Sequence, residues 1–145
     1  MLFRPFVVLT LVFTFSLVAR GDNAKDSDTL QGTWLPEKAE IGGKKIPDEV
    51  RKTIKLEIKD GKYRVSVGKG VDQGTVKLNP TAKPKEMDIN GTEGPNKGKM
   101  FRAIYEQDGD TLRICYNLSG TSRPKEFKTE EGTALFLATY KREKR

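Results

Sequence analysis

Few side chains in this sequence could carry out chemistry. The 145 residues contain no histidine and a single cysteine, Cys115. Without histidine neither a Ser-His-Asp nor a Cys-His arrangement can form, and the side chain that most often titrates near neutral pH is missing. One sulfur ligand cannot fill a tetrahedral zinc site. We therefore expect a protein that is not an enzyme and that holds no metal or cofactor.

Carboxylates are the remaining groups for acid-base chemistry, and Glu57, Asp88 and Glu106 are the candidates. Each alternates with apolar residues in a short segment, which places its side chain on the outer surface of a sheet. An enzyme built on these carboxylates is the third of three functional hypotheses. Cys115 alternates with the apolar face of its own segment, so it could be an inert thiol beneath a loop or a reactive thiol. The sequence favours the inert thiol, because only Arg113 lies near enough in sequence to activate it.

The first 21 residues have the pattern of a secretory signal peptide. Arg4 precedes an apolar run over residues 6–18, and the small residues Ala19 and Gly21 follow. The run of thirteen residues is shorter than the roughly 20 that a membrane-spanning helix needs. We therefore expect export to the periplasm or the medium, with a mature chain of residues 22–145 that forms one domain. Losing Arg4 and Arg20 lowers the net charge from +7 to +5.

Short segments with alternating apolar and polar residues recur between turn signals after Gly32. The clearest are two predicted hairpins, residues 54–67 with a turn at Asp60-Gly61 and residues 101–117 with a turn at Asp108-Gly109. Further strands are predicted at 74–80, 85–90 and 132–142, with a short edge strand at 123–128 and one short helix at 47–53. Tight turns between successive strands favour an all-β, antiparallel up-and-down barrel of about eight or nine strands over a Greek-key sandwich.

The only tryptophan, Trp34, follows Gly32 at the start of the first predicted strand. Its ring could stack on a ligand, form a partner contact or plug one end of the core. The Gly-x-Trp pattern resembles the start of the lipocalin-like proteins, and this resemblance implies that Trp34 closes one end of the barrel. It also implies that a basic side chain of the last strand, Lys141 or Arg142, covers the ring.

Seven blocks in order carry a second resemblance over nearly all of the mature chain. They are LQGTW, IGGKKIP, GTVKLNPTAKPKEMDI, GPNKGK, IYEQDGDTLRICY, RPKEF and TYKR. In this order they are similar to an uncharacterised exported domain family, described as lipocalin-like, that is abundant in planctomycete bacteria. The resemblance implies a fold and a cell compartment, and it carries over no catalytic residue.

Two functions remain. In the first, the barrel lumen binds a small apolar or amphipathic molecule. The candidate lumen residues are Tyr63, Val65, Val67, Leu112, Ile114 and Tyr116. The same inward-pointing rings and aliphatic chains could instead fill the barrel, and their size favours a filled core over an open lumen. In the second function, a cell-envelope module without an open lumen contacts a protein or an anionic polymer through the loops 83–85 and 93–99. Aromatic residues on apolar faces favour core packing over nucleic-acid binding, so we expect no nucleic-acid partner, and we expect a monomer.

The signal peptide leads to a direct prediction. Protein recovered from the medium or periplasm should begin at Asp22, because the small residues at 19 and 21 favour cleavage after Gly21. N-terminal sequencing measures this directly. Exported material that begins at Met1 would show instead that the segment is an uncleaved anchor.

Overall fold

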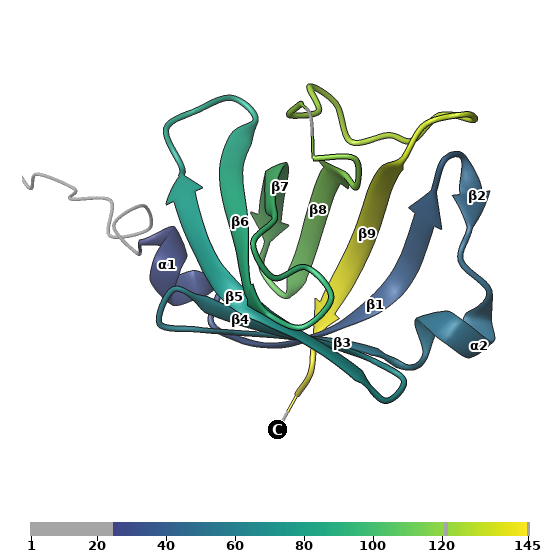
Figure 1. Cartoon of the computed structure of the whole chain (residues 1–145). Coiled ribbons are helices and arrows are strands. Elements are labelled where there is room, and N and C mark those ends of the chain that lie inside the picture. Colours follow the sequence, from purple (N-terminus) through teal and green to yellow (C-terminus); the bar gives the residue numbers. More distant parts are fainter. Residues whose placement is uncertain (1–24, 121, 145) are drawn as a thin grey trace, which may run out of the picture.

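The computed structural model describes residues 25–120 and 122–144, and the predicted signal peptide lies outside these residues. Two short helices and nine strands make up the described chain (Figure 1). The helices are α1 (Asp26–Thr29) and α2 (Asp48–Arg51). The strands are β1 (Gly32–Ile41), β2 (Lys44–Lys45), β3 (Ile54–Lys59), β4 (Lys62–Val67), β5 (Gly70–Asn79), β6 (Lys85–Glu93), β7 (Met100–Asp108), β8 (Thr111–Asn117) and β9 (Leu135–Arg142).

The strands from β3 to β9 follow one another around the sheet, each antiparallel to the next (Figure 1). β1 pairs with β3 on one side and with β9 on the other, which closes an eight-stranded barrel. The two-residue β2 is an extra strand beside β1. The predicted all-β up-and-down barrel is therefore confirmed, and closure leaves the eight barrel strands without a free edge.

The β3–β4 hairpin forms as predicted, with Lys59 paired to Lys62 across the turn. Asp60 and Gly61 have φ angles of 52° and 75°, the left-handed values that a tight hairpin turn needs. In the β7–β8 hairpin Asp108 pairs with Thr111, so the turn residues are Gly109 and Asp110, one position later than predicted. Despite this shift, the side chains predicted to face inward on both strands do face inward.

The predicted edge strand at 123–128 is wrong. This segment has no regular structure, because β8 already pairs with β9 and Pro124 has no N–H to donate to a ladder. Arg123 instead fixes it to the outer surface of the barrel, with guanidinium nitrogens 2.7 Å from Glu86 and 2.6 Å from Asp88. The predicted helix is α2, and α1 is a second helix that the sequence reading missed.

Cys115 lies beneath this outer segment and is fully buried. Its Sγ is 3.7 Å from the carbonyl oxygen of Lys128. Burial raises the pKa of the thiol above its ordinary value, which keeps it protonated at neutral pH. This environment is the one expected of an inert thiol tucked under a loop.

One end of the barrel is closed by Trp34, which has no exposed surface. Its indole Nε1 donates a hydrogen bond to the carbonyl oxygen of Leu30 at 2.9 Å. The guanidinium carbon of Arg142 lies 4.2 Å from the ring centroid, and Arg142 also donates to the carbonyl oxygen of Thr29 at 2.6 Å. Arg142 therefore covers the ring on the side of α1.

Gly32 gives the arginine its room. Its φ is +135°, and a Cβ placed there would lie 2.8 Å from a guanidinium nitrogen of Arg142. Of the two basic residues considered from sequence, Lys141 is exposed and donates to Thr111 at 2.7 Å instead. The arrangement thus requires a glycine at position 32 and an arginine at position 142.

α1 is fixed across the same end through Asp26. The carboxylate accepts hydrogen bonds from Lys85 Nζ at 2.8 Å and from the Tyr105 hydroxyl at 2.7 Å. Partial burial works against its ionisation, but the bonds from Lys85 and Tyr105 outweigh this, and the pKa of Asp26 is lowered. The helix thus holds Leu30, the acceptor for Trp34, in place.

Replacing the plug should unfold the barrel or severely weaken it. Trp34→Ala removes a fully buried ring, which costs about 3 to 5 kcal/mol of the roughly 5 to 15 kcal/mol that stabilises a domain. Trp34→Phe should keep part of the packing, and Leu35→Ala, at an exposed neighbour, should change the free energy of unfolding little. Urea denaturation measures all three. A Trp34→Ala protein of near-native stability that loses only ligand binding would show that the residue belongs to a binding site.

Candidate functional site

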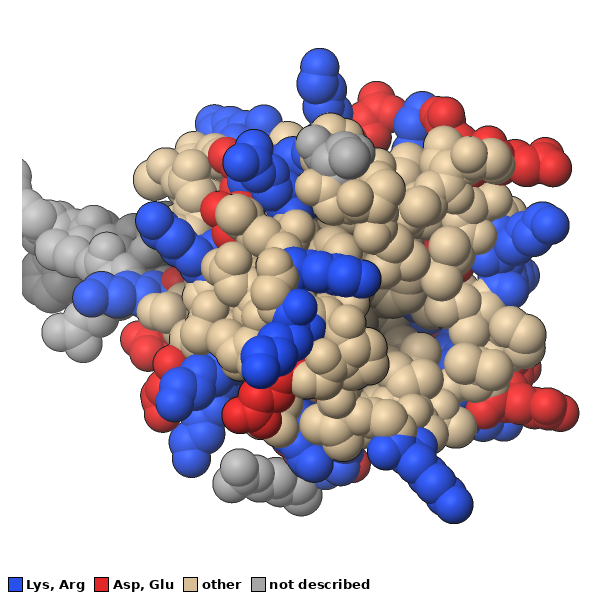
Figure 2. Space-filling view, in the orientation of Figure 1, with Lys and Arg blue, Asp and Glu red and all other residues tan. Residues whose placement is uncertain are grey.

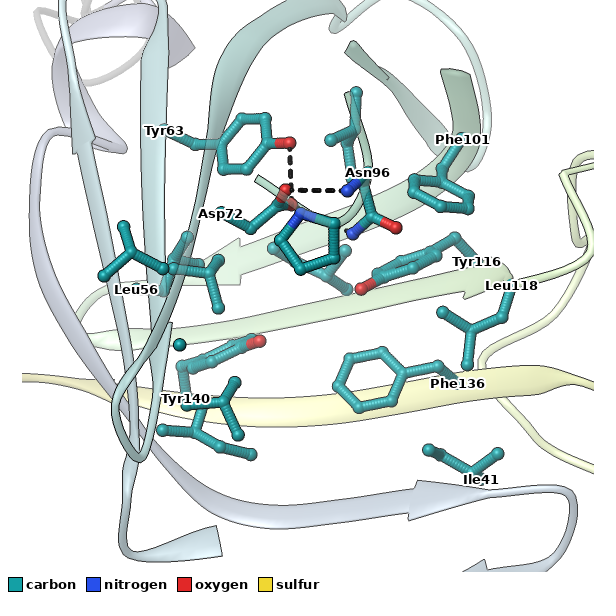
Figure 3. A pocket seen from close by; sticks show the side chains of 18 of the residues that line it. Ile41, Leu56, Tyr63, Asp72, Asn96, Phe101, Tyr116, Leu118, Phe136 and Tyr140 are labelled. Carbon is teal, nitrogen blue, oxygen red and sulfur yellow. Dashed lines mark hydrogen bonds between the residues drawn. The ribbon is translucent and has the colours of Figure 1, made fainter. Parts of the chain in front are cut away.

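The barrel encloses a mainly apolar cavity of about 390 Å³ (Figure 3), and Trp34 is not among the residues that line it. The filled core favoured from the sequence is therefore wrong. The largest fully buried side chains include Trp34, Tyr105 and Leu112, and none of these three lines the cavity. Because these large side chains fill the closed end of the barrel, the other half keeps an open lumen.

Five of the six candidate lumen residues line this cavity. They are Tyr63, Val65, Val67, Ile114 and Tyr116. The sixth, Leu112, does not line it, and the lumen assignment is corrected for this residue. Leu112 has no exposed surface and pairs with Tyr140 of β9, so it packs within the core nearer the closed end.

The cavity opens at the end of the barrel opposite the plug. Four apolar side chains that line it are also exposed at 38 to 45% of their surface. They are Ile41, Val50, Val67 and Leu118. Figure 2 shows a hollow in this face bordered by uncharged residues, with lysine and arginine side chains at its margin. An exposed apolar rim around an opening is typical of a ligand entrance.

A polar cluster stands on the otherwise apolar wall. Asp72 of β5 accepts hydrogen bonds from the Tyr63 hydroxyl at 3.1 Å, from Asn96 Nδ2 at 2.9 Å and from the Asn96 backbone N–H at 3.1 Å (Figure 3). The three residues come from β4, β5 and the loop after β6. The carboxylate thus fixes the 94–99 loop to the barrel wall, and Pro95 and Asn96 of that loop line the cavity.

Two glycines within strands make this arrangement possible. A Cβ at Gly91 would lie 2.0 Å from the carbonyl oxygen of Asn96, so only glycine lets the 94–99 loop fold back onto β6. At Gly74 a Cβ would meet the Asn90 carbonyl oxygen at 1.8 Å and the Tyr63 ring at 2.7 Å. Both positions are therefore constrained by the geometry of the mouth.

Two further hydroxyls point into the cavity, those of Tyr116 and Tyr140 (Figure 3). Within the described part of the chain neither hydroxyl has a hydrogen-bond partner. The Tyr140 side chain is buried, with an exposed fraction of 5%. Burial, with Asp72 as a lesser cause, raises the pKa of Tyr116 to about 12. Burial also raises the pKa of Tyr140, so both hydroxyls are protonated donors at neutral pH.

Sequence reasoning missed Asp72 and Asn96. The predicted strand began at Gly74, although Asp72 continues the alternation of Gly74, Val76 and Leu78 toward the inner face. Extending β5 by two residues would have found an inward carboxylate. Asn96 lies in an irregular loop, where no periodicity indicates which way a side chain points.

The carboxylates considered for catalysis lie elsewhere. Glu57, Asp88 and Glu106 form ion pairs with arginines, and none of the three lines the cavity. Among residues 25–120 and 122–144 no three metal-ligating side chains gather into a group that could hold a metal ion. Neither helix in these ranges has the length and apolarity to cross a membrane.

The fold and the site define a small, closed, up-and-down β-barrel with an apolar cavity open at one end. No protein-family model, curated protein or solved structure matches this chain. The assignment of a function therefore rests on the chemistry of the cavity.

The buried tyrosines predict alkaline instability. Burial raises the pKa of Tyr63, Tyr105, Tyr116 and Tyr140 above the ordinary value of 10.0. Above pH 10 the unfolded chain therefore releases protons that the folded chain keeps, so stability should fall as the pH rises from 10 to about 12. Urea denaturation across this range measures the fall. Tyrosinate absorbance that develops in the folded protein near pH 10 would contradict the prediction.

Proposed function

We propose that this protein binds a small apolar or amphipathic molecule in its lumen. The observation that carries the proposal is the cavity of about 390 Å³, which lies within the roughly 300 to 1,000 Å³ typical of small-molecule sites. Its wall is mostly aliphatic and aromatic, with a few convergent polar groups at Asp72, Tyr116 and Tyr140. Such a wall gives a ligand both buried contact and a fixed orientation.

Water is a poor occupant of this space. At roughly 30 Å³ per molecule the cavity would hold about a dozen waters. A water is well held when it makes two to four hydrogen bonds, and most of the wall offers none. Displacing such water with an apolar body favours binding, because poorly ordered water next to apolar surface is readily released.

The envelope-interaction alternative receives less support. This alternative requires a barrel without an open lumen and contacts made through the loops at 83–85 and 93–99. Lys85 is engaged with Asp26 in an ion pair at 2.8 Å, and Asn96 is turned toward the cavity through Asp72. These side chains serve the barrel itself, so ligand binding accounts for more of the structure.

We also propose that the protein is exported and belongs to the lipocalin-like family that its seven sequence blocks resemble. The signal-like residues 1–21 support export. The placement of Arg142 over Trp34, beside Gly32, supports the family, since it matches what the resemblance implies for the closed end.

Filling the lumen should weaken binding strongly without unfolding the protein. Val65 is half-buried and lines the cavity, so a ring in Val65→Phe has open space to occupy. We expect at least a tenfold loss of affinity for an uncharged hydrophobic dye such as Nile red, with a change in stability below about 1 kcal/mol. Dye fluorescence and urea denaturation measure the two quantities.

Leu35→Phe is the matched control, because Leu35 is exposed at 38% and does not line the cavity. It should bind the dye as the natural protein does. Equal binding by Val65→Phe and Leu35→Phe would place the dye on the outer surface, and the lumen proposal would then fail.

A further inference from the structure

We propose that the lumen selects amphipathic amines, with a cationic ammonium group at Asp72 and an apolar body against the inner wall. The inference rests on the proposed function, since it names the class of ligand that the same cavity takes. It is carried by the charge, the free hydrogen-bonding capacity and the aromatic surface of the cavity wall.

The charge of the wall has one sign. Asp72 is the only carboxylate among the cavity-lining residues of the described chain, and no lysine, arginine or histidine lines the cavity. Across the described ranges no basic side chain lies within ion-pair distance of Asp72. The carboxylate is held only by uncharged donors, so its charge is not neutralised by the protein. A negative charge beside an apolar cavity favours a cation as its partner.

The carboxylate also keeps a place for a donor. A carboxylate offers about four acceptor positions. Tyr63 and Asn96 Nδ2 donate to Oδ2, and the Asn96 backbone N–H donates to Oδ1. One position on Oδ1 remains, and an ammonium group brings N–H donors that fit it. The unpartnered hydroxyls of Tyr116 and Tyr140 can accept further N–H groups from the same ligand.

Aromatic rings surround this part of the cavity. Phe101 and Tyr116 have centroids 5.4 Å apart, and Tyr116 and Phe136 have centroids 5.1 Å apart, so the three rings form a continuous wall. Figure 3 shows Tyr63 and Tyr140 on other strands around the same space. The faces of aromatic rings attract a cation electrostatically, and their apolar bulk packs against an alkyl chain.

A fatty acid fits this wall poorly. Its carboxylate would carry the same charge as Asp72 and would find no lysine or arginine on the cavity wall. It could bind only with its head outside, at the lysine and arginine side chains around the mouth (Figure 2). In this rival mode a fatty acid would bind more tightly than an amine of the same chain length, and the experiment below distinguishes the two modes.

The experiment compares three molecules that share a decyl chain and differ in the head group. Decylamine, decanol and decanoate are titrated at neutral pH to displace Nile red from the full mature protein. We expect decylamine to bind at least about tenfold more tightly than decanol, because a hydrogen bond to a charged group is stronger than one between neutral groups. Decanoate should bind most weakly. Added salt should reduce the preference for the amine.

Asp72→Asn removes the charge and keeps an amide oxygen that can still accept from Asn96. In this variant decylamine and decanol should bind within about twofold of one another. Asp108→Asn is the matched control, because Asp108 is exposed at the β7–β8 turn. This substitution removes the same charge at a residue that does not line the cavity. It should keep the full preference for the amine.

Each result decides the proposal. An amine that binds no better than the alcohol, decanoate as the tightest ligand, or an unchanged amine preference in Asp72→Asn would overturn it while leaving lumen binding in place. If neither the dye nor any decyl compound binds, the proposed function falls as well. The comparison in the natural protein does not depend on how well Asp72→Asn folds, so the proposal stays falsifiable if that variant is unstable.

Discussion

The pairing of β1 with β9 is the constraint on which the rest of the structure depends. β1 runs from the closed end to the mouth and pairs with β9 along nearly its whole length, with a register shift between Pro36 and Lys38. This ladder joins the first and last strands of the barrel, so it is the contact that closes the sheet. The same ladder sets Trp34 opposite Arg142, which brings the plug and its covering cation together as a result of closure.

Closure also determines where empty space can exist. An eight-stranded barrel has an interior that its own side chains can fill or that can hold one small ligand. Here Trp34, Tyr105 and Leu112 are almost fully buried at the end that α1 covers. Part of the inner wall toward the mouth carries short side chains or none, at Val65, Val67 and Gly70. The uneven distribution of side-chain volume along the barrel axis, together with the glycines that admit the 94–99 loop, produces the cavity.

Local patterns in the sequence were enough to predict most of the barrel strands and the pairing of neighbours along the chain. The alternation of Ile54, Leu56 and Ile58 and the Asp60-Gly61 turn depend on neighbours in the chain, and both appear in the structure as expected. The lumen residues of β4 and β8 followed from the same alternation. Leu112 was misplaced, because alternation gives the face of a residue but not its depth along the barrel.

The open lumen could not be predicted in the same way. Its volume depends on how inward side chains from opposite walls meet, and that is a property of the closed sheet. The polar cluster joins β4, β5 and the loop after β6, and Asn96 reaches Asp72 only because Gly91 lets the loop fold back. Four-residue helices such as α1 are too short for a periodic signal, and the segment at 123–128 has strand-like residues but no strand edge to join.

Asp72 has two roles that are coupled by thermodynamics. The same carboxylate holds the 94–99 loop through Asn96 and faces the cavity. Any molecule that contacts Asp72 differently when the loop is docked and when it is released must change the docking equilibrium. By linkage, loop docking changes the affinity of that molecule by the same factor. Loop docking and ligand binding thus share one coupling free energy, which depends on the Asp72 side chain.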